Sequence, residues 1–243
     1  MTDIHCHILP GVDDGSRSIE ETLEMAAAAV RGGTNAVIAT PHCNLPGERP
    51  NYPCEELASR LDEARAALRR ADIPLRLYAG AEVFCSAGLP ELLARRRLQT
   101  LADSRYLLSE FDFGEHADEM DRLLRSIERF GYVPVIAHPE RYGAVQREPG
   151  LIGEWFSRGY VIQLNKDSVL GNLGRRCRRT ALWVLERGLA HIVASDGHGE
   201  GRRGASLSAV RDYIENEISI AYAGVLFDGN PERIIKDQPM LEA

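Results

Sequence analysis

The 243-residue sequence places metal-binding side chains at the ends of short apolar runs. The first run ends His5-Cys6-His7, and because side chains alternate across a strand, His5 and His7 should point to the same side. Five of the seven histidines end such runs, and carboxylates end others. The candidate ligands at run ends are His5, His7, His42, Glu82, Glu110, His138, Asp196 and His198. This repeated placement indicates one shared metal site.

Each candidate also has a structural interpretation, because a histidine can satisfy a core hydrogen bond and a carboxylate can mark the exit of a strand into solvent. The recurrence of the pattern favours ligation. Mixed imidazole and carboxylate ligands suit manganese, zinc or iron rather than Cu(I), and the absence of clustered thiolates argues against a purely structural zinc site. The set is too large for one ion, so we expect two or three. Ions about 3.5 to 4 Å apart can neutralise charge on a transferring phosphoryl group, which favours phosphoester hydrolysis.

These side chains can meet only if strands and helices alternate along the chain. Short β-rich apolar runs predict strands at residues 2–8, 36–40, 75–82, 106–111, 133–138, 161–165 and 192–196. Apolar residues spaced by three and four predict helices at residues 18–31, 54–70, 90–97, 117–130, 151–158, 178–187 and 206–216. Parallel strands joined by right-handed crossovers predict an α/β barrel. Reaction sites in such barrels lie at the C-terminal ends of the strands, where the candidate ligands fall.

Two histidines fall outside this pattern. His191 begins the last predicted strand, at the opposite end of the barrel from the ligands, and His116 lies among acidic residues at a helix start. We expect both to be structural or solvated. The aromatic residues Phe84, Phe111, Phe113 and Tyr142 lie near the inferred mouth, where they could pack against a substrate ring or close the top layer of the barrel.

Composition limits the domain organisation and the partners. No linker, low-complexity stretch or fixed-period repeat appears, and the loose regions are residues 44–53 and the tail after residue 237, so residues 1–243 are predicted to form one domain. Without a leader or apolar span, the protein is expected to be cytoplasmic, with no direct membrane insertion. The five cysteines are scattered along the chain, so we expect them to be reduced thiols rather than disulfides. The net charge of −7 argues against nucleic acid as a partner.

Several strings resemble the polymerase-and-histidinol-phosphatase superfamily over nearly the whole chain: DIHCH from Asp3, TPH ending at His42, GAE ending at Glu82, HPERY from His138, and SDGH ending at His198. The segment HILPGVDDG from His7 and the HPER segment are more similar to its bacterial protein-tyrosine phosphatases, which are encoded with capsule or exopolysaccharide genes. This resemblance implies a distorted seven-stranded, TIM-like (βα) barrel and three metals, commonly Mn²⁺, with Fe, Zn, Co or Mg as other candidates. It also implies a phosphotyrosine substrate on a partner, the C-terminal tail of a bacterial tyrosine autokinase.

The resemblance further implies three groups of ligands. The first is His5, His7, Glu82 and Asp196; the second is Glu82, Glu110 and His138; the third is Asp14, His42 and His198. Sequence spacing does not fix the direction of a loop side chain, so Asp13 remains an alternative to Asp14.

Two arginines match the phosphate-binding arginines of the family. These are Arg141 in the HPER segment and Arg203 before Gly204, and a planar guanidinium can bind two phosphate oxygens at once. The family usually has Arg-Pro-Pro at Arg203-Gly204-Ala205, so Arg202 remains a fallback. Arg141 could instead pair with a loop carboxylate, and Arg203 could simply begin a helix. No general acid is assigned, because a phenolic leaving group with a pKa of about 10 needs little protonation.

Three rival functions remain open at this stage. His42-Cys43 followed by five residues and Arg49 satisfies the loose HCx5R pattern of thiol-based tyrosine phosphatases, but Pro46 removes a backbone N–H from the loop that would hold phosphate. A small monoester such as histidinol phosphate could be the substrate of the same site. A non-catalytic regulatory module stabilised by metal is the third alternative.

Overall fold

The computed structural model describes residues 1–199 and 203–241, which form an α/β fold with parallel strands. The strands are β1 (Thr2–Cys6), β2 (Ala36–Ala39), β3 (His42–Cys43), β4 (Arg76–Ala79), β5 (Glu82–Phe84), β6 (Tyr106–Glu110), β7 (Val133–Ala137), β8 (Val161–Asn165) and β9 (Ile192–Ala194). The longer helices are α1 (Ile19–Arg31), α2 (Glu55–Arg70), α3 (Leu89–Ala94), α4 (Ala117–Arg129), α6 (Gly150–Ser157), α8 (Arg175–Leu185) and α9 (Ser208–Glu217). All seven predicted helices are therefore present, with ends shifted by a few residues.

Short helical segments fill several connections. They are η1 (Leu101–Asp103), η2 (Pro139–Arg141), α5 (Gly143–Arg147), α7 (Lys166–Leu170), α10 (Ile220–Gly224), the π-helix η4 (Val225–Gly229) and α11 (Asn230–Ile235). None of these was predicted, because a segment of one or two turns is too short to show a helical period. Helix α1 ends at Arg31, as predicted, and Gly33 follows with a φ of +87°, which suits a residue without a side chain.

The strands divide between two parallel sheets, and this differs from the predicted ring of seven. One sheet has the order β1-β2-β4 and the other β3-β5-β6-β7-β8-β9. The predicted strands 36–40 and 75–82 are each interrupted, so that β2 and β4 pair in the first sheet while β3 and β5 pair in the second. Pro41 lacks the N–H of a continuous ladder, and a Cβ at Gly80 would lie 2.6 Å from Ile38 Cγ2. The sheets do not close into one ring.

Backbone contacts nevertheless connect the first strand to the segment after the last. Cys6 and Gly197 form an isolated parallel bridge, and the His7 N–H donates to the Gly197 carbonyl oxygen at 2.8 Å. The Asp196 N–H donates to the His5 carbonyl oxygen at 2.9 Å. The C-terminal ends of β1 and β9, which carry candidate ligands, are thereby held side by side.

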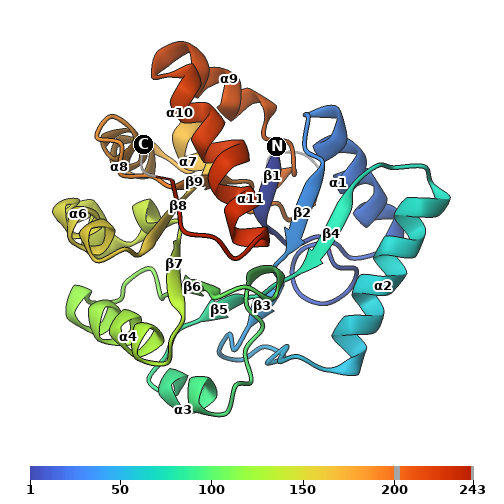
Figure 1. The fold of residues 1–243 in the computed structure, drawn as a ribbon, viewed down its shortest axis with the longest axis horizontal. Coiled ribbons are helices and arrows are strands. Elements are labelled where there is room, and N and C mark those ends of the chain that lie inside the picture. The colour runs from blue at the N-terminus through green and yellow to red at the C-terminus, as the bar shows by residue number, and fades with distance from the viewer. Residues whose placement is uncertain (200–202, 242–243) are drawn as a thin grey trace.

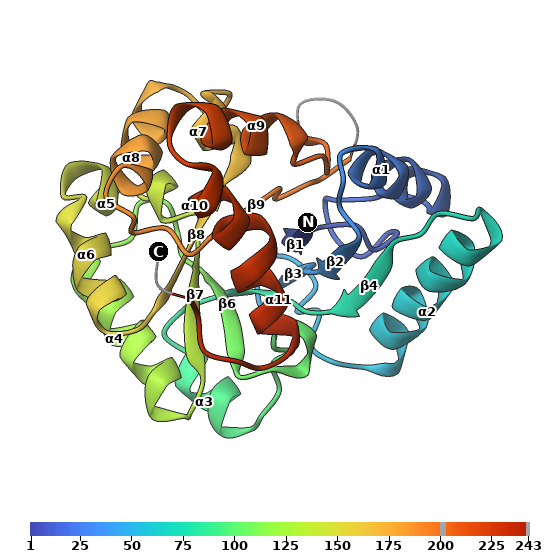
Figure 2. The same cartoon turned by 45° about the horizontal axis from the view of Figure 1, so that its top comes forward.

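Helices surround the strands (Figures 1 and 2). A layer of buried apolar side chains lies between the strands. In Figure 1, α1 and α2 lie on the side of β2 and β4, while α4, α6 and α8 lie on the side of β7 and β8. Six strands contribute to one buried cluster, and α11 adds Ile234 to it. Its strand residues include Ile4, Ile38, Leu108, Val135, Val161 and Ile192. This packed layer supports the polar groups at the C-terminal ends of the strands. In the part of the chain that the structure describes, no helix combines the length and apolar character needed to cross a membrane.

His191 has the structural role that the sequence predicted for it. Its ring is buried and stacks on Phe156 at a centroid distance of 4.6 Å, and its Nδ1 accepts a hydrogen bond from the Ile162 N–H at 3.1 Å. Burial lowers the pKa of His191 to about 4. His116, by contrast, is exposed at the start of α4.

This histidine should make stability depend on pH. Its pKa is lower in the folded than in the unfolded state, so its contribution is fully present above about pH 6.5 and is lost as the pH falls toward 4, where the unfolded chain binds the proton. We expect His191→Asn, which keeps an acceptor but cannot be protonated, to reduce the loss of unfolding free energy over that range by about 2–3 kcal/mol. Urea denaturation at several pH values measures this, with His116→Asn as the control. Parallel curves for wild type and His191→Asn would contradict it.

Candidate metal centre

The nine predicted ligand residues all lie in one cluster, at or after the ends of β1, β6, β7 and β9 and at the first residues of the short strands β3 and β5. Four overlapping groups offer ligand atoms within 4.8 Å of one another. These groups are His7, Asp14, His42 and His198; His5, His7 and Asp196; His5, Glu82 and His138; and His42, Glu82 and Glu110. The grouping differs in detail from the three sets implied by the resemblance, because His5, His7, His42 and Glu82 each belong to two groups.

The strand ends determine which way the ligands point. His5, His42, Glu82 and Glu110 lie on strands β1, β3, β5 and β6. Strands β3 and β5 are parallel, and His42 of β3 is directly opposite Glu82 of β5. His138 and Asp196 follow β7 and β9 in the left-handed region, with φ of 34° and 48°. Non-glycine residues in this region carry strain of about 1–3 kcal/mol, which persists only where the surrounding structure holds the backbone in place.

Hydrogen bonds on the far side of three imidazole rings orient the ring nitrogens that face the cluster. His5 Nδ1 donates to Gln163 Oε1 at 3.0 Å, and His7 Nδ1 donates to Asp13 Oδ2 at 2.7 Å. The Nε2 atoms of His5 and His7 are thereby directed into the cluster, where they approach each other to 3.3 Å. His198 has the same arrangement, since its Nδ1 donates to the Asp196 carbonyl oxygen at 2.9 Å. Metal-binding histidines are held in this way.

Glu82 lies at the centre of the cluster and contacts four imidazoles. Its Oε1 lies 2.9 Å from His138 Nε2 and 3.2 Å from His5 Nε2. Its Oε2 lies 3.3 Å from His7 Nε2 and 3.1 Å from His42 Nδ1. The two oxygens of one carboxylate therefore face different ligand groups, as a carboxylate that bridges two ions must.

The cluster also carries the electrostatic character of a cation site. Burial and the nearby Glu82 charge raise the pKa of Glu110 to about 8. Burial would raise the pKa of Glu82 too, but the neighbouring imidazoles hold it well below its usual range. Burial opposes a charge on His5, yet Glu82 and Asp196 outweigh it and raise the pKa of His5 to about 9. Buried carboxylates here demand positive charge, which divalent cations supply while displacing protons.

Unsatisfied polar atoms give an independent test of whether cations fit. Among the described residues, four buried atoms of these side chains make no hydrogen bond of suitable geometry: His42 Nδ1, Glu82 Oε2, Glu110 Oε2 and His138 Nδ1. Burying such groups without partners is costly, so this polar arrangement is stable only if something else engages them. The nitrogen and oxygen donors suit manganese, iron or zinc.

The structure separates the roles of the two loop aspartates. Asp13 is engaged by protein donors, because its Oδ2 accepts from His7 Nδ1 and from the His42 N–H at 2.9 Å, and its Oδ1 accepts from the Gly15 N–H at 3.0 Å. Asp14 Oδ1 instead lies 3.3 Å from His198 Nε2 and 3.4 Å from His42 Nε2, within a ligand group. This geometry favours Asp14 over Asp13 as the ligand.

Both candidate phosphate-binding arginines reach the cluster. Arg141 Nη1 donates to Asp196 Oδ2 at 3.1 Å, and its guanidinium lies 4.5 Å from the centre of the Phe113 ring. Arg203 Nη2 contacts His198 Nε2 at 3.0 Å. Arg202 lies outside the described residues. Both described arginines thus border the ligands from the solvent side.

A pocket of about 290 Å³ opens over the ligands. Its lining residues are Asp14, His42, Leu45, Glu82, Phe84, Glu110, Phe111, Asp112, Phe113, His138, Arg141, Asp196 and Arg203. Phe113 is 45% exposed at its mouth, whereas Phe111 and Tyr142 are buried against each other with their rings at 85°. Of the aromatic residues near the mouth, Phe111 and Tyr142 therefore close the layer below the pocket.

Residues that support the ligands were missed in the sequence. Gln163 holds His5, and Asn165 Nδ2 donates to Asp196 Oδ2 at 2.7 Å. Both lie on β8, whose five residues are all buried. A glutamine inside a buried strand was a usable signal, because a buried amide needs a partner.

The thiol-based alternative does not agree with the geometry. Cys43 is fully buried, and burial raises the pKa of its thiol to about 12, whereas a nucleophilic cysteine needs a lowered pKa. Arg49 lies on the surface and pairs with Glu56 at 3.1 Å. Nothing in this arrangement forms a phosphate-binding loop around Cys43.

Parallel α/β architecture with a buried imidazole–carboxylate cluster beside the strand ends defines the class of the protein, an α/β fold with a candidate metal centre. D-hydantoinase from Thermus sp. shares this fold at 10% identity and a TM-score of 0.56, with 99% of this chain and 72% of that chain covered. The family described as capsular polysaccharide synthesis, CpsB/CapC, matches residues 1–236. The chain belongs to the CpsB/CapC family.

Relatives in this family match over nearly their full length. Tyrosine-protein phosphatase YwqE of Bacillus subtilis is 34% identical, with 98% of this chain and 92% of YwqE covered. Tyrosine-protein phosphatase CpsB of Streptococcus pneumoniae is 32% identical, with 98% and 99% covered. A crystal structure from a study of YwqE and CpsB as metal-dependent tyrosine phosphatases superposes with a TM-score of 0.92 at 33% identity, covering 100% of this chain and 97% of that one.

The hydrogen bond from His7 to Asp13 generates a prediction about metal affinity. Asp13→Asn removes the charge that fixes the ring of His7, so we expect the affinity for Mn²⁺ to fall by about 10- to 100-fold. Titration calorimetry on chelator-treated protein measures this, with Asp118→Asn on the exposed face of α4 as the matched control. An unchanged affinity in Asp13→Asn would show that Asp13 does not support the site.

Proposed function

We propose that this chain is a metal-dependent protein-tyrosine phosphatase, a phosphoric monoester hydrolase acting on phosphotyrosine in a protein. One observation carries the proposal: nine imidazole and carboxylate residues form one cluster, and six of them line a pocket together with two arginines. Relatives named tyrosine-protein phosphatases match almost the whole chain, which supports the same substrate class.

The proposed ligands are the residues of the cluster. His5, His7, Glu82 and Asp196 would hold one ion, Glu82, Glu110 and His138 a second, and Asp14, His42 and His198 a third. The two differently directed oxygens of Glu82 support a shared ligand, and the nitrogen and oxygen donor set supports Mn²⁺. When bound, such ions supply Lewis-acid stabilisation of phosphoryl charge and lower the pKa of water.

The protein side chains have separate tasks in this mechanism. Arg141 and Arg203 bind phosphate oxygens and stabilise the charge that develops on them. Phe113 holds the Arg141 guanidinium over its ring, and Asp196 orients the same group by a hydrogen bond. The tyrosine side chain leaves as a phenolate, whose pKa of about 10 makes a strong general acid unnecessary.

The physiological setting is part of the same proposal. The description of the family supports a role in capsule or exopolysaccharide synthesis, and we propose the C-terminal tail of a bacterial tyrosine autokinase as the phosphorylated partner. Cytoplasmic action suits five cysteines scattered without pairs. We also propose that residues 1–243 form one domain, a distorted seven-stranded barrel in which β2 with β3, and β4 with β5, count as single strands. Six of these strands bury residues in the inner layer, and Tyr78 of β4, in the seventh, packs against it, which supports this count.

Metal removal should separate the proposed function from its alternatives. We expect turnover of a phosphotyrosine peptide to require Mn²⁺ and to be lost after chelation, because the carboxylates would otherwise repel the phosphate. Cys43→Ser should retain activity, since Cys43 is buried away from the pocket. A steady-state assay with histidinol phosphate alongside measures the substrate class. Faster turnover of histidinol phosphate, or no turnover of either compound with Mn²⁺, would overturn the proposal.

Two substitutions test the individual roles. His42→Ala removes a proposed ligand and Arg141→Ala a proposed phosphate-binding group, so each should lower kcat/KM by about 10²- to 10³-fold while the circular dichroism spectrum is retained. Arg129→Ala, at the exposed end of α4, is the control. Near-normal kcat/KM in both variants would exclude the mechanism.

A further inference from the structure

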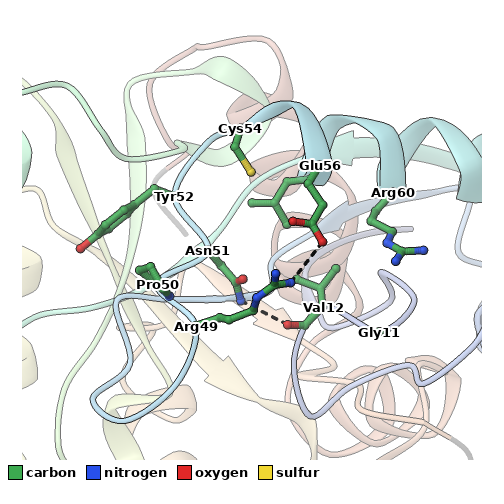
Figure 3. A pocket seen from close by; sticks show the side chains of 10 residues that line it. Gly11, Val12, Arg49, Pro50, Asn51, Tyr52, Cys54, Glu56 and Arg60 are labelled. Carbon is green, nitrogen blue, oxygen red and sulfur yellow. Dashed lines mark hydrogen bonds and ion pairs between the residues drawn. The ribbon is translucent and has the colours of Figure 1, made fainter.

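The pocket over the ligands continues into a groove outside the metal centre. A second hollow of about 490 Å³ shares Asp14, His42 and Leu45 with the pocket, and it runs between the loop after β1 and the loop after β3. A third hollow of about 240 Å³ shares four residues with the second (Figure 3). The shared residues are Gly11, Val12, Arg49 and Asn51. The reaction site therefore opens at one side into an extended surface channel, the flanking groove.

Hydrogen bonds hold the walls of this groove. Asn51 Nδ2 donates to the Val12 carbonyl oxygen at 3.3 Å and to the His42 carbonyl oxygen at 2.9 Å, so that it connects both loops. Asn44 Nδ2 donates to the Phe84 carbonyl oxygen at 2.9 Å. Residues 44–53, expected to be loose, are thus attached to the strands that carry the ligands. A preformed groove binds a ligand with less ordering cost.

The lining of the groove combines apolar surface with exposed guanidinium groups. Val12, Pro50, Tyr52 and Leu57 line the outer hollow, and its charged side chains are Arg49, Arg60 and Glu56. Figure 3 shows Arg49 reaching toward Glu56, with Arg60 from the next turn of α2 beside them. The outer hollow thus carries a formal charge of +1 in a chain whose net charge is −7.

Arg49 can exchange its present partner at little cost. Its ion pair with Glu56 is solvent exposed, at 68% and 56% of the two side chains, and exposed pairs are weak. Arg60 pairs with Glu63 in a similarly exposed setting. In the middle hollow, apart from Asp13 and Asp14 of the metal centre, the charged residues are Arg17, Arg49 and Glu48. With Asp13 and Asp14 counted, the middle hollow carries a formal charge of −1, so the outer hollow, at +1, is the part of the groove that favours an anionic group.

We propose that the flanking groove binds the polypeptide next to the phosphotyrosine, and that an acidic side chain of this polypeptide pairs with Arg49 and Arg60. The inference rests on the proposed tyrosine phosphatase function. A phosphotyrosine enters the pocket with its phosphate first, which leaves its main chain at the mouth, where the groove begins. The groove leads from this mouth past Asn51 to Arg49 and Arg60, so a polypeptide that follows it brings residues next to the phosphotyrosine to these two arginines. A small phenyl phosphate fills the pocket without entering the groove.

The experiment compares two classes of substrate in the same full-length enzyme with Mn²⁺. The variant is Arg49→Glu with Arg60→Glu, and the substrates are phosphotyrosine peptides with glutamates on the N-terminal or the C-terminal side, their glutamine counterparts, and p-nitrophenyl phosphate. We expect kcat/KM for one of the glutamate peptides to fall by about tenfold or more, mainly through KM, because like charges now face each other. The kcat/KM for p-nitrophenyl phosphate should stay within about twofold of the wild-type value, since this small substrate does not use the groove.

A matched charge reversal provides the control. Arg69→Glu with Arg70→Glu places the same charges at the other, exposed end of α2 and should leave every substrate unchanged. Equal peptide kcat/KM in wild type and the Arg49 and Arg60 variant overturns the groove proposal, even if the wild type is an active phosphatase. An equal loss for peptide and p-nitrophenyl phosphate also overturns it, because the arginines would then serve the reaction pocket. Absence of turnover by the wild type refutes the proposed function itself.

Discussion

The burial of Glu82 among imidazoles is the interaction on which the site depends. A carboxylate that is only 1% exposed must be compensated by nearby positive charge, and four ring nitrogens lie within 3.3 Å of it. The pKa values of His5, His7 and His42 are raised, so these three rings can carry that charge. The same nitrogens could bind cations instead. On the opposite side of the rings, the Nδ1 atoms of His5 and His7 have hydrogen-bond acceptors, and that of His138 has none. The cluster is therefore an arrangement that exchanges protons for metal ions. Glu110 also lies in the cluster, and its pKa depends on the charge of Glu82 in the same way.

The breaks in two predicted strands determine where Glu82 lies. Between Ala39 and His42, and again between Ala79 and Glu82, the chain leaves one sheet and joins the other. Without the break, the alternation of side chains would continue unchanged from β2 into β3. Pro41 and Gly80 are suited to these positions because one lacks a ladder donor and the other allows close approach of Ile38. The departure from a regular barrel thus lies directly beside the ligands.

Much of this arrangement could be predicted from the sequence, and the omissions have physical causes. Strand alternation was sufficient to place His5 and His7 on one side, and the repeated strand ends were sufficient to bring distant residues together. Loop direction was not predictable, so Asp13 and Asp14 could be distinguished only once the hydrogen bonds of Asp13 were visible. The division into two sheets depends on tertiary packing around Pro41 and Gly80. Helices such as α7 and α11 are too short to impose a period on the sequence.

The distribution of ligands between the sheets has a mechanical consequence. His5 and His7 come from the sheet of β1, whereas His42, Glu82 and Glu110 come from the other sheet. Ions bound by ligands from both sheets would connect one sheet to the other. Because a ligand that binds only the folded state stabilises it, occupancy of the site and resistance of the whole molecule to heat would rise and fall together. Catalytic activity and thermal stability would then both depend on the bound ions.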